Sequence, residues 1–287
     1  LTERPANEAI ATSGRMGPKK IEVVVTDLGE YINQQCCERS FKLRLNKQEV
    51  ARKYPFYPAV RNPLNPVLAT TGAKREKELK EDLKKRMRYL NPTEEDGTRI
   101  TWEQFVDALS GIKAGEDCFA TEVEVGREMD AFRVTGRMDF ALVLWKGGAP
   151  CLRIVECKAS RKDRTYHRVQ LATYRIMVTK LLENGLVIGG KRFDSVPIES
   201  VVARIDEGTN RLQNVLELPS LDLREEIEDV LSLLSPGGPL DYVAGHDLDE
   251  LGFCLEAKCD SCVHCPICLP DTAHKRRLEL VGADPSV

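Results

Sequence analysis

The stretch "GRMDFALVLWKGGAPCLRIVECKAS" (residues 136–160) decides the fold. Two runs rich in Val, Leu and Ile flank a short "KGGAP" segment, which is typical of two β-strands joined by a tight turn. Asp139 lies early in the first strand, and Glu156 and Lys158 lie late in the second. Side chains alternate along a strand, so Glu156 and Lys158 share one face while Cys157 points to the other. Buried charges need partners, so we expect these three charges to meet.

Two carboxylates and an ammonium group form a suitable site for a hard divalent cation. Mg²⁺ accepts carboxylate oxygens and stabilises charge that develops on a phosphate, which favours phosphodiester hydrolysis. The alternative is that Glu156 and Lys158 end an exposed edge strand and are solvated. The E-x-K triplet does not decide between these interpretations.

The remaining pattern predicts an α/β domain with a mixed sheet flanked by helices. We expect strands in 119–125, 131–145, 151–160 and 195–206, and helices near 70–90, 163–184 and 222–235. Two capping boxes predict helix starts, one at Asp27 with Glu30 and one at Thr101 with Gln104. Four prolines predict a loop over residues 54–66.

Composition is that of a soluble globular protein, with 42% hydrophobic residues, 30% charged residues and a net charge of −3. No apolar run is long enough to span a membrane, and no signal peptide is visible. Ten cysteines without a leader then indicate a reducing, cytoplasmic location, where thiols more often bind metal than form disulfides. We expect a flexible tail over 1–20 and one domain over 21–287, with a helical part (21–115), a core (116–235) and a cysteine-rich segment (250–275).

Four cysteines in "AKCDSCVHCPICLP" (257–270) indicate a metal centre. Four thiolates satisfy tetrahedral zinc, and cysteines at three-residue spacing also occur in iron–sulfur proteins. Four ligands from so short a segment are crowded around a single ion. Zinc and an iron–sulfur cluster both remain open from the spacing.

Several motifs together resemble the RecB-type branch of the PD-(D/E)xK nucleases. "GRMD" is similar to its G-x-x-D motif and "ECK" to its E-x-K motif, while "QLATY" (170–174) is similar to its Q-x-x-x-Y signature. "TGAKREKEL" (71–79) resembles its G-x-x-x-H element, with Glu76 where histidine is usual. The resemblance implies a restriction-endonuclease-like core. It assigns Mg²⁺ or Mn²⁺ to Glu76, Asp139, Glu156 and the backbone carbonyl of Cys157, and catalytic roles to Asp139, Glu156, Lys158, Gln170 and Tyr174.

The same resemblance implies a DNA nuclease, with exonuclease or end-processing activity on single-stranded DNA in recombination, repair or defence against foreign DNA. A helicase or other partner would deliver the DNA, and no membrane is involved. The alternative is a nucleic-acid-binding or scaffolding module that keeps the fold without turnover.

The AddB nuclease domain and the CRISPR adaptation nucleases, which this chain resembles, join their chain ends with a [4Fe–4S] cluster. The Cys-x₂-Cys-x₅-Cys spacing of Cys259, Cys262 and Cys268 is similar to theirs, and "CERSFKL" (37–43) supplies Cys37 as the fourth ligand. Cys36 lies on an apolar stripe and is predicted to be core, and Cys265 is left without a ligand role. Zinc is the alternative occupant.

Basic residues beyond the E-x-K motif are candidate phosphate contacts. "SRKDRTYHR" (160–168) contributes Arg161, Lys162, Arg164 and Arg168, which we expect to border the metal site and bind the DNA backbone.

Overall fold

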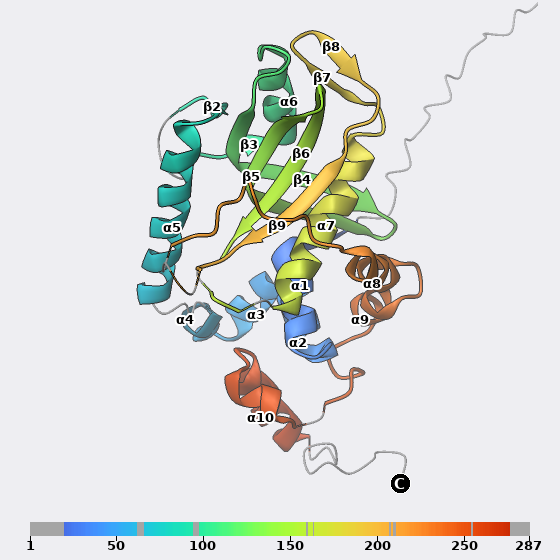
Figure 1. Ribbon diagram of the computed structural model, residues 1–287. Coiled ribbons are helices and arrows are strands. Elements are labelled where there is room, and N and C mark those ends of the chain that lie inside the picture. Colours follow the sequence, from blue (N-terminus) through green and yellow to red (C-terminus); the bar gives the residue numbers. More distant parts are fainter. Residues whose placement is uncertain are drawn as a thin grey trace, which may run out of the picture.

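A mixed, seven-stranded sheet forms the centre of the molecule in the computed structural model (Figure 1). The structure describes residues 20–61, 66–93, 98–158, 160–162, 164–206, 208, 211–253 and 255–275. The predicted tail over residues 1–20 lies outside these residues apart from Lys20. The strands of this sheet are β1 (Ile21–Val24), β2 (Arg88–Tyr89), β3 (Ile100–Thr101), β4 (Cys118–Met129), β5 (Phe132–Lys146), β6 (Ala149–Cys157) and β9 (Ile198–Ala203).

The main path through the sheet runs β2-β4-β5-β6-β9. β4, β5 and β6 form an antiparallel meander, β9 returns parallel to β6, and β2 lies parallel to β4. β1 and β3 add parallel pairings to β5 and β4 respectively. Two short strands, β7 (Leu186–Ile188) and β8 (Lys191–Phe193), form a separate hairpin. The predicted mixed α/β sheet is confirmed.

Helices cover both faces of the sheet and extend below it (Figure 1). Those before the meander are α1 (Val25–Asn33), α2 (Glu38–Leu45), α3 (Lys47–Lys53), α4 (Tyr57–Arg61), α5 (Pro66–Lys84) and α6 (Trp102–Ser110). Those after it are α7 (Thr165–Leu181), α8 (Arg224–Leu234), α9 (Pro239–Gly245), a 3₁₀ turn η1 (Ala257–Ser261) and α10 (Cys265–His274). None of the helices in these described ranges is long and apolar enough to cross a membrane.

The two faces of the sheet bury separate hydrophobic cores. The larger core joins the sheet to α1, α6, α7 and α8, with Val134, Ala141 and Ile154 among its sheet residues. The smaller core lies under α5 and contains Leu83 and Phe140. Because the second half of β5 and most of β6 are buried on both faces, they read as nearly continuous apolar runs in the sequence.

β5 changes its partner near its middle. Residues 132–135 pair with β1, whereas residues 140–146 pair with β6. In the segment between them, Gly136, Arg137 and Met138 pair only with β4, and Asp139 belongs to no strand pair among the described residues. One side of β5 is therefore open over the four residues of the G-x-x-D motif, and the end of β6 lies beside that opening.

Side-chain alternation also breaks at this point in β4 and β5. Met138 packs into the larger core, but Phe140, two residues on, packs into the smaller one. In β4 the matching irregularity is Glu122, whose backbone is left-handed with φ of 57°. A non-glycine residue in this region is uncommon and is held there by its surroundings. Because the flanking pairs keep one register, Glu122 lies opposite Asp139.

Two local expectations were wrong. Asp27 does not cap a helix: α1 starts directly after β1 with Val24 at its N-cap, and Asp27 lies in the first turn, where it pairs with Arg44. Residues 54–66 were expected to form a loop but contain α4 and the first residue of α5. Pro58 and Pro66 lie at the starts of these helices, where a missing N–H breaks no hydrogen bond. The capping box of Thr101 and Gln104 is confirmed.

We predict that Gly136→Ala destabilises the protein by about 1–3 kcal/mol, the usual cost of overpacking a core. A Cβ atom at Gly136 would lie 2.6 Å from Cγ2 of Val25 and 2.7 Å from Cε1 of Tyr174. Thermal or urea unfolding measures the loss. Gly245→Ala is the control, because a Cβ atom there meets no atom within 4 Å. Equal effects of the two substitutions would contradict this reason for the glycine.

Candidate active site

The middle of β5 and the end of β6 bring the predicted charges together at the opening in the sheet. Asp139 accepts a hydrogen bond through Oδ2 from the backbone N–H of Cys157 (2.7 Å). Lys158 donates to Oε1 of Glu156 and forms an ion pair with it. Glu156 is only 4% exposed, and its other oxygen, Oε2, has no hydrogen-bond partner among the described residues. The solvated-edge alternative for Glu156 is therefore excluded.

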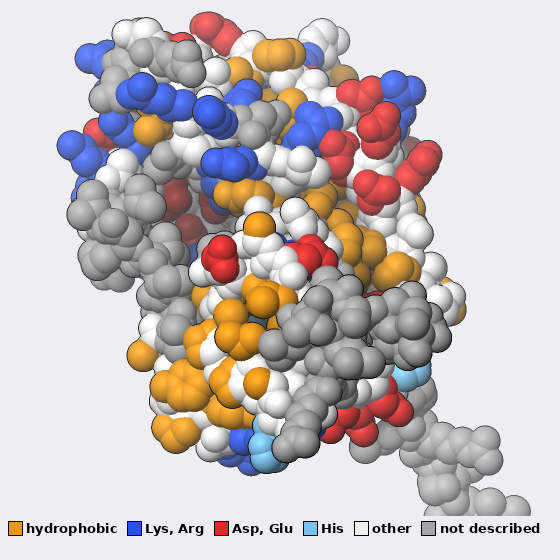
Figure 2. All heavy atoms as spheres, turned by 90° about the horizontal axis from the view of Figure 1, so that it is seen from below, with side chains coloured by type: hydrophobic (Ala, Val, Ile, Leu, Met, Phe, Trp, Pro, Cys, Tyr) orange, Lys and Arg blue, Asp and Glu red, His pale blue; other side chains and the backbone are white. Residues whose placement is uncertain are grey.

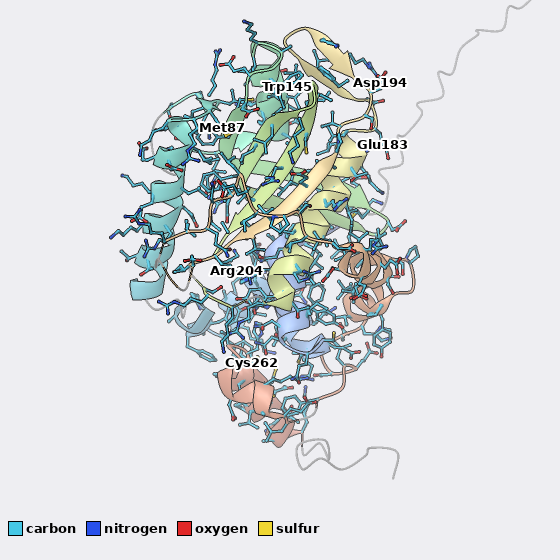
Figure 3. The ribbon with its side chains drawn as sticks, in the orientation of Figure 1. Met87, Trp145, Glu183, Asp194, Arg204 and Cys262 are labelled. Carbon is cyan, nitrogen blue, oxygen red and sulfur yellow. The ribbon has the colours of Figure 1, made fainter. Side chains whose placement is uncertain are left out.

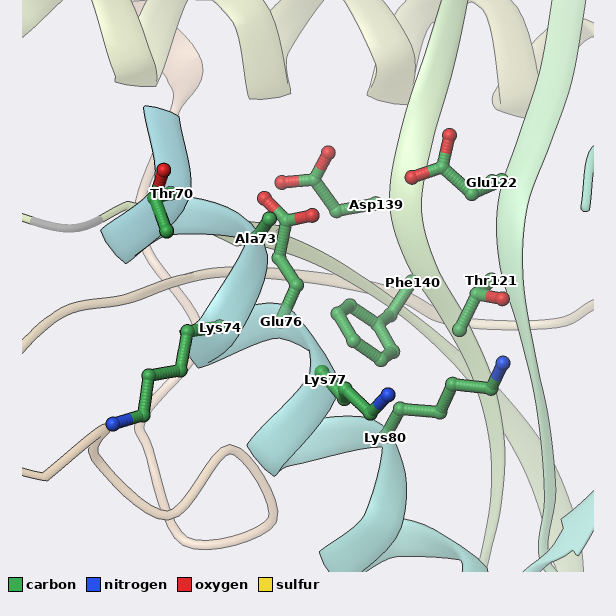
Figure 4. A pocket seen from close by; sticks show the side chains of 10 residues that line it. All are labelled: Thr70, Ala73, Lys74, Glu76, Lys77, Lys80, Thr121, Glu122, Asp139 and Phe140. Carbon is green, nitrogen blue, oxygen red and sulfur yellow. The ribbon is translucent and has the colours of Figure 1, made fainter. Parts of the chain in front are cut away.

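A helix supplies a further carboxylate from the opposite side. α5 directs Glu76 toward Asp139, and Glu122 of β4 points to the same space (Figure 4). These residues line a pocket of about 650 Å³ together with lysines and threonines of α5 and β4. A second hollow of about 830 Å³ includes Asp139, Glu156, Lys158 and Tyr174 in its lining. Asp139 thus borders both.

Burial raises the pKa of each carboxyl group in the predicted metal site, and repulsion by neighbouring carboxylates adds to the rise for Glu76 and Glu156. Burial, followed by the charges of Asp139 and Glu122, raises the pKa of Glu76 to about 7. Burial, followed by the charge of Asp139, raises the pKa of Glu156 to about 7, and burial also raises the pKa of Asp139. Burial alone would lower the pKa of Lys158, but Glu156 and Asp139 raise it above its usual range. The site therefore has more negative charge than its lysine balances.

Glu122 and Arg137 form an ion pair at the rim of this site. Oε2 of Glu122 lies 2.6 Å from Nε of Arg137. Burial raises the pKa of Glu122, Arg137 lowers it, and Asp139 raises it further. Neither residue belongs to the predicted catalytic set, and the sequence shows no period or spacing that would have singled out Glu122.

Tyr174 and Gln170 lie on α7, behind the motif of β5. The hydroxyl of Tyr174 donates to the backbone carbonyl of Arg137 (2.7 Å) and accepts from its N–H (3.2 Å). Gln170 is buried against α1, where a Cβ atom at Gly29 would lie 3.2 Å from its Cγ. Tyr174 therefore supports the sheet, and Gln170 supports α1.

Comparison with known proteins identifies the family of this arrangement. The profile of the PD-(D/E)XK nuclease superfamily matches residues 59–269, which include Glu76, Asp139, Glu156 and Lys158. The chain belongs to the PD-(D/E)XK nuclease superfamily. A search of curated protein sequences returned no match. The crystal structure of SSO0001 is similar, with a TM-score of 0.41 and 16% identity over 88% of this chain and 87% of that one.

Membership of the PD-(D/E)XK superfamily points to a nuclease, a hydrolase that uses divalent metal ions in this superfamily. Across the described residues, no three His, Cys, Asp or Glu side chains are arranged to hold a metal ion. The donor set nevertheless fits one, because Glu156 has an unpartnered buried oxygen and the carboxyl groups repel one another. The ammonium of Lys158 is the cation beside Glu156 in this arrangement.

The four predicted phosphate contacts differ in their surroundings. Arg161, Lys162 and Arg164 are exposed in the segment between β6 and α7. Arg168 instead binds α8, through an ion pair with Glu226 and a hydrogen bond to the carbonyl of Asp222 (2.5 Å). On the face seen in Figure 2, many basic side chains gather at the upper left and many acidic ones at the upper right, while further acidic side chains lie between and below them.

The cysteine-rich segment, marked by Cys262, lies at the opposite end of the molecule from Trp145 (Figure 3). Burial raises the pKa of Cys37, the backbone of Ser40 and the charge of Lys258 lower it, and the nearby thiols of Cys262 and Cys259 add a smaller rise. Burial also raises the pKa of Cys268 to about 12, with Cys37 and Cys262 adding to the rise. Cys37 therefore lies near Cys259, Cys262 and Cys268, although no set of these described thiols stands at ligand geometry.

Cys265 and Cys36 complete the group of thiols. Cys265 also lies near Cys259 and Cys262, which raise its pKa after burial does so. The prediction that Cys36 is core was wrong: it is exposed, with φ of 57°. α1 ends at Asn33, so Cys36 falls outside the helical stripe on which that prediction relied. Cys118, Cys151 and Cys157 are buried as predicted, and Cys254 lies outside the described residues.

Polar contacts join helices α2 and α4 to the C-terminal segment. The guanidinium of Arg39, which is 1% exposed, binds the carbonyl of Leu248 (2.7 Å) and the carboxylate of Asp271 (2.9 Å). The buried ring of His264 lies between the hydroxyls of Ser40 and Tyr57, each 2.9 Å away. Sequence reasoning missed these residues, although Arg39 stands inside the quoted "CERSFKL" segment.

We predict that a divalent cation stabilises the protein more at pH 8 than at pH 5.5. Glu76 and Glu156 have pKa values of about 7 in the folded chain against an ordinary value of 4.5. Between these values the folded state holds protons that the unfolded state has released, so raising the pH through 7 removes stability. Mn²⁺ should restore it at pH 8, where both carboxylates are charged, and protons should compete with it at pH 5.5.

The measurement is the thermal midpoint with Mn²⁺ or with EDTA at both pH values. Glu76→Gln should reduce both the midpoint loss on raising the pH and the gain from Mn²⁺, because it removes one of the two titrating groups. An unchanged midpoint with Mn²⁺ at pH 8 would contradict metal binding by these carboxylates.

Proposed function

We propose that the protein is a Mg²⁺- or Mn²⁺-dependent DNA nuclease that acts on single-stranded DNA or free DNA ends. The observation that supports this most directly is the excess of buried carboxylate over cation at the opening between β5 and β6. Glu156 is buried with one orphaned oxygen, and the nearby charges of Asp139 and Glu76 both raise its pKa. Uncompensated buried charge is costly, and a divalent ion offsets it.

The residues that would hold the ion are Glu76, Asp139 and Glu156, with the backbone carbonyl of Cys157. A bound Mg²⁺ or Mn²⁺ supplies a Lewis acid for the scissile phosphate and acidifies a water molecule. Asp139 is held for this role by the N–H of Cys157, so one of its oxygens has a fixed direction. Tyr174 fixes the backbone two residues earlier, at Arg137.

Lys158 would orient the attacking water. Its pKa is raised by Glu156 and Asp139, so its ammonium group stays protonated near neutral pH. A protonated lysine donates hydrogen bonds and stabilises anionic charge, but it does not accept a proton. We therefore assign Lys158 the role of positioning and electrostatic stabilisation, with Gln170 and Tyr174 supporting the helix and strand behind it.

The substrate proposal follows from the charge around the two hollows that meet at Asp139. Arg99, Arg133 and Arg137 line the larger hollow, and Lys74, Lys77 and Lys80 line the smaller one. Arg161, Lys162 and Arg164 extend the positive charge beyond Lys158. Such residues neutralise backbone phosphates without reading sequence, which suits end-processing by an exonuclease in recombination, repair or defence. A helicase or another partner would present the strand.

We also propose that Cys37, Cys259, Cys262 and Cys268 hold a [4Fe–4S] cluster, with zinc as the alternative occupant. The proximity of Cys37 to thiols of the distant C-terminal segment supports this. Apolar burial disfavours free thiolates there, so a cationic centre would stabilise them. The catalytic residues lie elsewhere, and we assign the cluster a structural role.

The proposed activity is tested by degradation of labelled single- and double-stranded DNA. We expect Mg²⁺ or Mn²⁺ to support cleavage and Ca²⁺ to bind without supporting it, because Ca²⁺ is a weaker activator of bound water. Lys158→Ala should lower the rate by at least about 100-fold, the usual contribution of such a group, while DNA binding persists. Cleavage in excess EDTA would contradict the metal mechanism. DNA binding without cleavage under all conditions would identify a scaffolding module.

The cluster is tested by iron and sulfide analysis of protein purified without oxygen. We expect about four iron atoms and four sulfides per chain, the stoichiometry of the cube. Cys37→Ser should bleach the protein and lower its thermal midpoint, whereas Cys265→Ser should do much less. The reverse ranking would instead favour a local site in 259–268. A colourless protein with one zinc per chain would show that zinc occupies the site in place of the cluster.

A further inference from the structure

Arg137 stands beside the catalytic carboxylates with its guanidinium partly in solvent. It belongs to the G-x-x-D motif and lies two residues before Asp139, in the lining of the larger hollow with Glu156 and Lys158. Its side chain is 43% exposed, so it is accessible to a ligand in that hollow. Its backbone is held at both polar atoms by the hydroxyl of Tyr174.

Glu122 fixes the direction of this guanidinium. The carboxylate is 15% exposed and approaches Arg137 at Nε, 2.6 Å from Oε2. Its position depends on the left-handed backbone of Glu122, a conformation that costs energy in a non-glycine residue and clusters at functional sites. Arg137 is the exposed partner of this pair, and ion pairs that are open to solvent contribute little to stability, so stability alone gives little reason to keep that conformation.

The geometry of the pair leaves the far edge of the guanidinium available. The terminal Nη1 and Nη2 atoms form no ion pair or hydrogen bond with another residue among the described ones. This edge matches two oxygens of a phosphate, a pairing that arginine makes more specifically than lysine. A carboxylate on Nε therefore orients the group without occupying its bidentate edge.

We infer that Arg137 binds a backbone phosphate of the substrate strand next to the scissile bond, and that Glu122 is its positioning residue. The inference rests on the proposed function, and it specifies how the substrate is held at that site. The metal carboxylates repel a polyanionic strand, and Arg137 offsets that repulsion within the same hollow. The pair would therefore act on substrate binding more than on the chemical step.

The experiment uses the full chain with labelled single-stranded DNA, in Ca²⁺ for binding and in Mg²⁺ for cleavage. The variants are Arg137→Gln, Arg137→Lys, Glu122→Gln and the double variant of Arg137→Gln with Glu122→Gln. Arg192→Gln is the matched control, because Arg192 of β8 forms an exposed ion pair with Asp194. Thermal midpoints show that each variant is folded, and Arg137→Lys keeps the charge should Arg137→Gln lower the midpoint.

We expect Arg137→Gln to weaken binding about tenfold and to reduce the salt dependence of log Kd by about 0.7, the value for one phosphate contact on a single strand. Arg137→Lys should keep the salt dependence and recover part of the affinity, because lysine lacks the bidentate edge. Glu122→Gln should raise KM about threefold with kcat nearly unchanged. In the double variant it should add nothing to the effect of Arg137→Gln, because both residues act through one contact. The control should match the wild type.

Unchanged affinity and salt dependence in Arg137→Gln would overturn the inference and leave the nuclease proposal standing. A lower kcat with a higher metal requirement in Glu122→Gln would make Glu122 a metal ligand and overturn its positioning role. If the wild type binds DNA but never cleaves it, the nuclease proposal fails, and the binding measurements still decide the role of Arg137.

Discussion

The burial of carboxylates where β5 changes its partner is the constraint on which the rest of the structure depends. Glu156 is buried and Asp139 is half-buried because the sheet is covered by α7 on one face and α5 on the other. Their charges are offset only in part, by Lys158 and by the N–H of Cys157. A fold that keeps such an imbalance has lower stability than an apolar core would give, and in return it has a site that attracts a cation.

A second constraint acts at the chain ends, where the cysteine-rich segment meets α2 and α4. Arg39 of α2 and His264 of the C-terminal segment are both buried, and each forms hydrogen bonds across this contact. Ordinary hydrogen bonds therefore hold the C-terminal segment in place. These bonds bring Cys37 close to thiols that are more than 200 residues away in sequence, at Cys259, Cys262 and Cys268. Thiols gathered in this way need little further ordering to accept a metal centre, since the loop has been closed by other contacts.

The sequence predicted the meander, α7, β9 and the meeting of Asp139, Glu156 and Lys158, because strand alternation and the tight turn act over short distances. It did not predict α4, because proline was taken as a breaker where it begins a helix. The capping role of Asp27 and the burial of Cys36 failed for a related reason: helix ends depend on β1 and on a left-handed turn that propensity does not show. Glu122 was missed because its position follows from a backbone irregularity and from pairing with a strand that comes later.

The four residues of the G-x-x-D motif show why a motif can be recognised before its roles are understood. Gly136 is small because Val25 and Tyr174 occupy the space of a side chain. Arg137 has its backbone fixed by Tyr174 and its side chain by Glu122, Met138 fills the larger core, and Asp139 faces the site. The first three residues of the motif therefore hold the stretch of strand that carries Asp139. Tyr174 bonds both backbone polar atoms of Arg137 on the side of β5 that faces away from β4, and Gly136 leaves room for its ring, so Asp139 follows a stretch of strand that is held there by a side chain instead of by a neighbouring strand.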